Sequence, residues 1–111
     1  MSFALLYITH PSEAEAKRVS QHLLEQQLIA CANIFPITSA YWWQGAIQNE
    51  QEWVSIVKTT LENYERVKNE VEKVHTYKVP CILKIEVEAN RVYEQWIRES
   101  VAVFSPKQKG C

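Results

Sequence analysis

The sequence predicts an α+β domain: a four-stranded antiparallel sheet with two helices on one face, a long hairpin and an extra C-terminal helix. Segments of strand and helix character follow one another in the order β-α-β-β-α-β along the 111 residues, and a further helical pattern comes last. Two strand-like runs flank Gly45, the only glycine before the C-terminal tail, as is typical of a hairpin. The economical packing of this order is the ferredoxin-like (βαββαβ) arrangement, which places the first and third strands at the centre.

The N-terminal third contains a strand and a helix. Residues 3–9 form a nearly continuous apolar run, as expected of a central strand, and His10-Pro11 ends it. Ser12 and Glu15 have the spacing of a capping box. The helix that follows should end near Gln27 and bury one apolar stripe, made of Ala16, Val19, Leu23 and Leu24.

The hairpin spans residues 29–60, with its reversal at Gln44-Gly45. An arm of roughly 15 residues reaches about 50 Å, whereas a domain of this length has a diameter of roughly 35 Å. Unless Pro36 bends the first arm sharply, the tip projects from the body. An apolar projecting ribbon requires cover from another chain, so we expect an oligomer with Tyr41, Trp42 and Trp43 at its interface.

The C-terminal half repeats the alternation of helix and strand. Thr59 and Glu62 have the spacing of a second capping box, and Asn90 is a candidate N-cap for the last helix. His75 should end the second helix, where a cationic imidazole would face its last carbonyls. The expected inward residues are Tyr64, Val67, Val71 and Val74 on the second helix, Cys81, Leu83, Ile85 and Val87 on the last strand, and Tyr93, Trp96, Ile97 and Val101 on the last helix.

Composition bounds the class of protein. Residues 1–111 form one domain with a loose tail from about residue 105, and a net charge of −1 without a cationic run argues against nucleic-acid binding. No segment is apolar and long enough for a bilayer, and the N-terminus does not resemble a signal peptide. Three cysteines without tight spacing favour a reducing compartment, so we expect a cytoplasmic protein.

Catalytic motifs are missing from the sequence. With two glycines there is no phosphate-binding loop, and no Gly-x-Ser-x-Gly elbow occurs, so we expect neither an enzyme nor an organic cofactor. Of the three histidines, His22 is expected to be structural and His10 to lie in a loop. His75 is either a helix cap or a metal ligand, and the Cys81 thiolate is a second candidate ligand, suited to copper.

An ordered set of motifs resembles the CutA family of divalent-cation tolerance proteins over nearly the whole chain. The likeness is carried by residues 28–34, Pro36, Ser39, Tyr41, residues 43–45, Glu52, Lys58-Thr59, residues 75–80, Tyr93 and Trp96-Ile97. The resemblance implies a ferredoxin-like homotrimer, similar to PII signalling proteins, in which hairpins reach onto neighbouring subunits. It also implies that His75 matches the histidine associated with copper binding.

The chain departs from that pattern at three positions. Ile8 and Val74 stand where copper-binding members carry a cysteine and a second histidine, and Cys81 replaces an acidic residue. Three functions therefore remain open. They are binding of, or response to, a divalent metal such as copper, a PII-like module with a small molecule in a cleft lined by Lys58, His75 and Tyr77, and a ligand-free structural or anchoring trimer.

Overall fold

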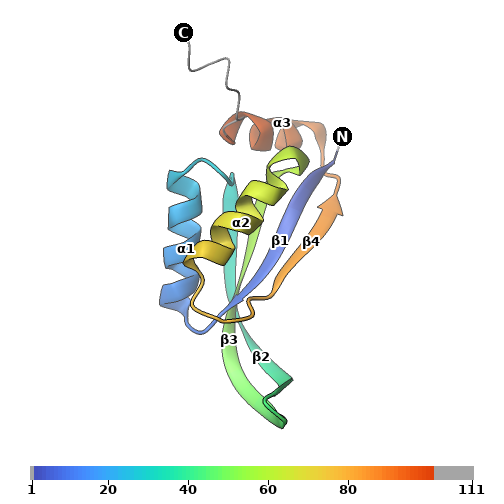
Figure 1. The fold of residues 1–111 in the computed structure, drawn as a ribbon. Coiled ribbons are helices and arrows are strands. Elements are labelled where there is room, and N and C mark those ends of the chain that lie inside the picture. Colours follow the sequence, from blue (N-terminus) through green and yellow to red (C-terminus); the bar gives the residue numbers. More distant parts are fainter. Residues whose placement is uncertain (1, 102–111) are drawn as a thin grey trace.

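The chain folds in the predicted order of elements. The computed structural model describes residues 2–101, and the tail expected to be loose lies outside them. A short 3₁₀ turn (η1) precedes the second helix (Figure 1). The elements are β1 (Phe3–His10), α1 (Glu13–Glu25), β2 (Cys31–Trp43), β3 (Ala46–Thr60), η1 (Leu61–Asn63), α2 (Tyr64–Val74), β4 (Ile82–Val87) and α3 (Arg91–Ser100).

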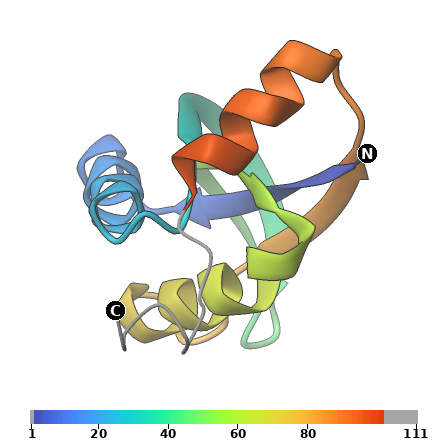
Figure 2. The same cartoon turned by 90° about the horizontal axis from the view of Figure 1, so that it is seen from above.

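The strands form one antiparallel sheet in the order β2-β3-β1-β4. This confirms the prediction that the first and third strands are central. Figure 2 shows α2 and α3 on opposite sides of β1. Cys31 in β2 and Cys81 beside β4 accordingly lie toward opposite edges, and both are free thiols.

Each face of the sheet carries one apolar cluster, because successive side chains of β1 point to opposite sides. Ala4, Leu6 and Ile8 face the helical layer, and the other side of β1 is covered at one end by α3. The helical layer contributes Val19 and Leu23 from α1 and Val67 and Val71 from α2, while α3 places Ile97 against Phe3.

Half of the capping box predicted for the first helix is present, since the Glu15 carboxylate pairs with Arg18 instead of the Ser12 N–H, and the cap of the second helix is displaced. The Ser12 hydroxyl accepts the Glu15 N–H at 3.1 Å. At the second site Thr60, not Thr59, accepts the Asn63 N–H at 3.3 Å and starts η1. The Thr59 hydroxyl instead donates to the Leu28 carbonyl at 2.7 Å, so this threonine joins β3 to the loop between α1 and β2.

The hairpin projects from the body, as its length predicts. Its two arms stay in register from Cys31 opposite Lys58 to Trp43 opposite Ala46, and Pro36 lies within the edge strand β2 without ending it. Gln44 and Gly45 both have positive φ angles, 50° and 80°, which is the geometry of a two-residue type I′ turn. The chain measures 54 × 32 × 22 Å, and its radius of gyration of 15.3 Å exceeds the value of about 13 Å for a compact domain.

Several apolar side chains remain exposed in the single chain. Trp42 at the hairpin tip is 71% exposed and Leu83 in β4 is 52% exposed, with Ile85 beside it. The prediction that the alternating apolar residues of β4 are half-buried is therefore wrong at these two positions. They share the face of Leu5 and Tyr7, which the helices α1 and α2 do not cover. The inward positions predicted for Leu24 and Trp96 are also wrong, because both side chains are exposed.

Candidate functional site

The candidate site lies where the connector after α2 meets the end of β1 and the base of the hairpin. The connector, residues 75–81, joins the end of α2 to the start of β4. It contributes three side chains to the candidate site. His75, Tyr77 and Cys81 come from the connector, His10 ends β1, and Glu52 belongs to β3. The residues that the sequence marks for chemistry are thus held by elements far apart along the chain.

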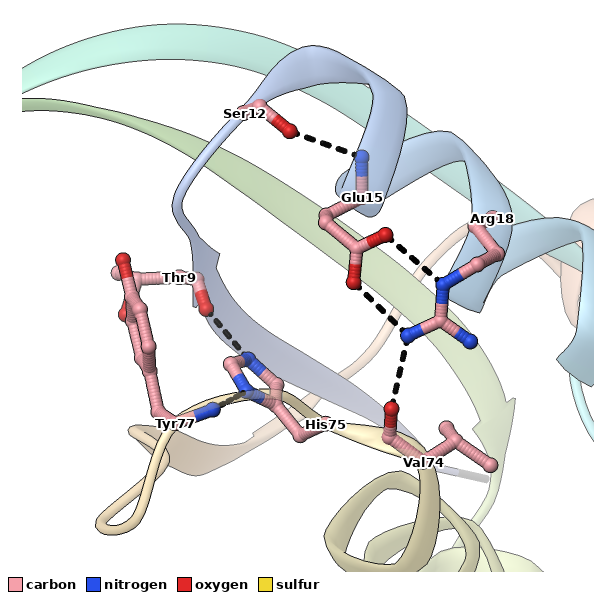
Figure 3. A network of polar contacts seen from close by, with 7 residues as sticks. All are labelled: Thr9, Ser12, Glu15, Arg18, Val74, His75 and Tyr77. Atoms are coloured by element: carbon pink, nitrogen blue, oxygen red, sulfur yellow. Dashed lines mark hydrogen bonds and ion pairs between the residues drawn. The ribbon is translucent and has the colours of Figure 1, made fainter.

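Both ring nitrogens of His75 are engaged within the chain (Figure 3). Its Nε2–H donates to the Thr9 carbonyl at 2.7 Å, and its Nδ1 accepts the Tyr77 backbone N–H at 3.0 Å. These two partners define a neutral imidazole with its proton on Nε2. The sequence predicted that the His75 ring faces the last carbonyls of α2. The ring instead binds the Thr9 carbonyl and so connects residues 75–81 to β1.

The carbonyl end of α2 is bound by an arginine from α1. Arg18 donates to the Val74 carbonyl at 2.8 Å and to both carboxylate oxygens of Glu15, at 2.8 and 2.9 Å (Figure 3). Glu15 in turn belongs to the Ser12 cap. A cation at a helix C-terminus is favoured by the helix dipole, so Arg18 fills the role predicted for His75.

His10 is a buried member of the site and not the loop residue expected. It is the last residue of β1, where it continues the inward alternation of Ala4, Leu6 and Ile8. Its ring stacks on His75 with centroids 5.1 Å apart, and its Nε2 lies 2.8 Å from the Ser55 hydroxyl. Burial lowers the pKa of His10 to about 4.

Glu52 is a carboxylate that the fold buries. Its side chain is 6% exposed and accepts the Tyr77 hydroxyl at 2.6 Å. Burial and then this carboxylate raise the pKa of Tyr77, so the phenol stays protonated. Burial, with a smaller contribution from Glu52, also raises the pKa of the Cys81 thiol. The sequence alone does not reveal the burial of Glu52, because its partner Tyr77 lies 25 positions away in the connector.

An open cavity of about 840 Å³ lies between the connector and the hairpin. Its lining combines aromatic rings with two carboxylates. The residues that matter for its chemistry are Tyr41, Trp42, Trp43, Glu50, Glu52 and Tyr77. The neighbouring Glu50 carboxylate raises the pKa of the Tyr41 phenol, and Glu52 accepts the Tyr77 hydroxyl.

The other predicted site residues are not brought together. Lys58 donates to the Tyr93 hydroxyl at 3.0 Å, and it lies six positions along β3 from Glu52, a distance of about 20 Å. Cys81 and Tyr77 line the cavity, whereas His75 and Lys58 do not. In residues 2–101 no group of three or more His, Cys, Asp or Glu side chains is arranged to hold a metal ion.

The fold and site define a class: a ferredoxin-like domain with an overlong hairpin and a polar connector packed at its base. Residues 4–100 match the model of the CutA1 divalent ion tolerance protein family, and the chain belongs to this family. The divalent-cation tolerance protein CutA of Archaeoglobus fulgidus is 45% identical over 97 residues, covering 86% of this chain and 95% of that protein. Its counterpart in Thermotoga maritima is 44% identical over 98 residues, with 87% and 97% covered.

Solved structures agree with the sequence relatives. The Archaeoglobus fulgidus CutA structure superposes with a TM-score of 0.86 at 44% identity, covering 92% of this chain and all of that one. The divalent ion tolerance protein CutA1 of Ehrlichia chaffeensis gives a TM-score of 0.87 at 41% identity, with 91% and 96% covered. The predicted fold class and family are therefore confirmed.

The predicted cytoplasmic location is corrected by these comparisons. The Archaeoglobus fulgidus structure is described as a periplasmic divalent cation tolerance protein, and a rice relative as chloroplastic. The three cysteines therefore do not identify the compartment of this chain. The two thiols that the structure describes, Cys31 and Cys81, are unpaired. No helix within residues 2–101 has the length and apolar character to cross a membrane.

Proposed function

We propose that this chain serves divalent-cation tolerance as a non-catalytic homotrimer that binds or responds to a metal ion such as copper. The observation that carries this proposal is the match of residues 4–100 to the CutA1 family, at up to 45% identity with proteins named for divalent-cation tolerance. Exposed apolar side chains on two parts of the chain support the trimer. They are the hairpin tip, Tyr41 to Trp43, and the uncovered sheet face at Leu83 and Ile85.

We propose His75 and Cys81 as the metal ligands. Neither side chain is ready to bind a metal ion in the arrangement described above, so binding requires a local rearrangement. Both nitrogens of His75 have partners, so coordination breaks its hydrogen bond with Thr9 or with Tyr77. The thiolate form of Cys81 is disfavoured because its pKa is raised. We therefore expect weak binding that strengthens as the pH rises, since a thiolate is the ligand form.

Titration calorimetry with Cu(II), Zn(II) and, under reducing conditions, Cu(I) tests the metal proposal. His75→Ala and Cys81→Ser should each weaken binding about tenfold or more, whereas Cys31→Ser on the far edge should not. Equal affinities for all variants would remove both residues from the site. Absence of binding by the wild-type protein would refute direct metal binding.

Ultracentrifugation tests the trimer separately. The double variant Trp42→Ser, Trp43→Ser should dissociate or aggregate, because burial of these aromatic rings contributes several kcal/mol per subunit. A double variant that stays trimeric and equally heat-stable would contradict the role of the tip. A wild-type particle of 13.0 kDa at low micromolar concentration would refute the trimer itself.

The cavity favours a second candidate function, that of a PII-like module binding a small molecule. Its volume of about 840 Å³ lies in the range of ordinary ligand pockets. The cleft proposed from the sequence used Lys58, His75 and Tyr77, and of these Tyr77 lines the cavity. A thermal-shift screen of nucleotides, metabolites and amines on the intact protein would separate this function from a ligand-free structural trimer.

A further inference from the structure

The outer face of α3 is a surface that takes no part in the core or in the candidate site. The helix packs on the sheet through its inner side chains, Tyr93, Ile97 and Val101. Five exposed residues line an open hollow on its outer side: Arg91, Val92, Gln95, Trp96 and Glu99. Two of them are large and apolar, with Val92 77% exposed and Trp96 44% exposed. The outer face therefore combines apolar surface with two opposite charges.

The charges of this face are arranged so that it fits a second copy of itself. Arg91, Gln95 and Glu99 are spaced four residues apart, so they form one ridge along the helix. Gln95 lies midway, with a cation and an anion each about 6 Å from it along the axis. When two such helices lie antiparallel about a two-fold axis at Gln95, each Arg91 comes level with the Glu99 of the other copy. A parallel arrangement would place like charges together.

The neighbouring ridge supplies the apolar part of the contact. Val92 and Trp96 are also four residues apart, and the antiparallel order brings each Val92 toward the Trp96 of the other copy. In the part of the chain that the structure describes, Arg91 forms no ion pair, and the Glu99 carboxylate accepts only the Gln95 amide, at 3.3 Å. Both charges can therefore pair across the contact.

We propose that the outer face of α3 binds the same face of a second copy of this chain, with the two helices antiparallel. Figure 1 shows α3 at the end of the domain opposite the hairpin tip, so this contact does not involve the tip. A single contact is weak, because exposed ion pairs contribute little and a helix about 15 Å long buries less area than a standard interface. The inference rests on the proposed trimer for its strength, since two trimers can form up to three such contacts at once.

Sedimentation velocity over a series of protein concentrations tests this surface in the intact protein. We expect the trimer to form a particle of twice its mass as the concentration rises. Added salt should reverse this step, because screening weakens exposed ion pairs. Arg91→Glu and Glu99→Arg should each raise the concentration needed for half association about tenfold or more, because each substitution places like charges together twice in every contact.

The double variant Arg91→Glu, Glu99→Arg exchanges the two charges and restores opposite pairs across an antiparallel contact. It should recover the association that each single variant loses. Both reversals suit the helix dipole, with an acid near the start of α3 and a base near its end, so the fold should be retained. Val92→Ser should also weaken association. Glu72→Arg on α2 changes the net charge as Glu99→Arg does and should have no effect, so it is the control.

Two results overturn the proposal. One is a wild-type protein that never exceeds the trimer up to its solubility limit, which leaves the trimer itself standing. The other is a double variant that associates no better than the single variants. Wild-type chains that associate only in twos, with the same response to the variants, would support the α3 contact and refute the trimer, so the two proposals fail separately.

Discussion

Acidification should destabilise this protein through His10 before its carboxylates protonate. The imidazole is 1% exposed and stacks on His75, and its pKa in the folded protein is about 4, against the ordinary value of 6.5. The folded state therefore binds fewer protons than the unfolded state between these two values. The stability contributed by neutral His10 is present above pH 6.5 and is lost as the pH falls toward 4.

The size of the loss follows from the shift in pKa. Each unit corresponds to about 1.4 kcal/mol, so the full effect is about 3 kcal/mol once the pH reaches the folded-state value. Glu15 and Glu70 have pKa values lowered by hydrogen bonds, to Arg18 and His22 respectively. Their contributions are present above the ordinary carboxylate value and are lost at more acidic pH, so they overlap with His10 only at the acidic end.

Urea unfolding at a fixed protein concentration, repeated from neutral pH to pH 4, measures this effect. His10→Gln keeps an amide in reach of the Ser55 hydroxyl and cannot titrate, so its stability should fall less steeply with acid than that of the wild type. His22→Gln at the part-exposed pair with Glu70 is the control. Parallel pH profiles for the wild type and His10→Gln would refute the assignment to His10.

Five further substitutions, at three places in the fold, test local contacts by denaturant unfolding. Gly45→Ala places a side chain at φ 80° in open space, so it should cost about 1 kcal/mol of backbone strain, while Gln44→Asn should stabilise the same turn. No change in Gly45→Ala would argue against the type I′ geometry. Tyr77→Phe removes the hydroxyl bound to buried Glu52 and should cost about 2 kcal/mol, and Glu52→Gln in the same background should recover part of that loss. Ser20→Ala should be neutral or stabilising by about 1 kcal/mol, because the buried Ser20 hydroxyl has no hydrogen-bond partner among residues 2–101. A loss of stability there would reveal a partner for the hydroxyl.

Local sequence signals predicted most of the fold. The Gln44-Gly45 reversal, the Ser12 cap and the apolar period of α2 depend on neighbouring residues, and the structure confirms them. The length of the two arms also predicted the projecting tip, since strand geometry fixes the reach of the chain.

The faces of the elements were harder to predict. The alternation in β4 is correct, but the sequence does not say which face of the sheet the helices will cover, and Leu83 and Ile85 lie on the other one. Trp96 is exposed for a related reason: α3 crosses one end of the sheet and buries chiefly Ile97.

The candidate site depended on contacts between distant parts of the chain. His75 bonds Thr9 across 66 positions, and Arg18 reaches Val74 across 56. Periodicity cannot reveal such pairs. One signal was available for His10, because it occupies the next inward position after Ile8, and this period-two pattern predicts burial.

Pro36 has a consequence for how copies of this chain meet. It sits in the edge strand β2 and has no N–H, so the outer row of backbone donors that β2 offers is interrupted. A strand from a second copy can form backbone hydrogen bonds with β2 before or after Pro36, but it cannot form an unbroken ladder along the whole edge. The interruption therefore favours a small closed assembly over an endlessly growing fibre.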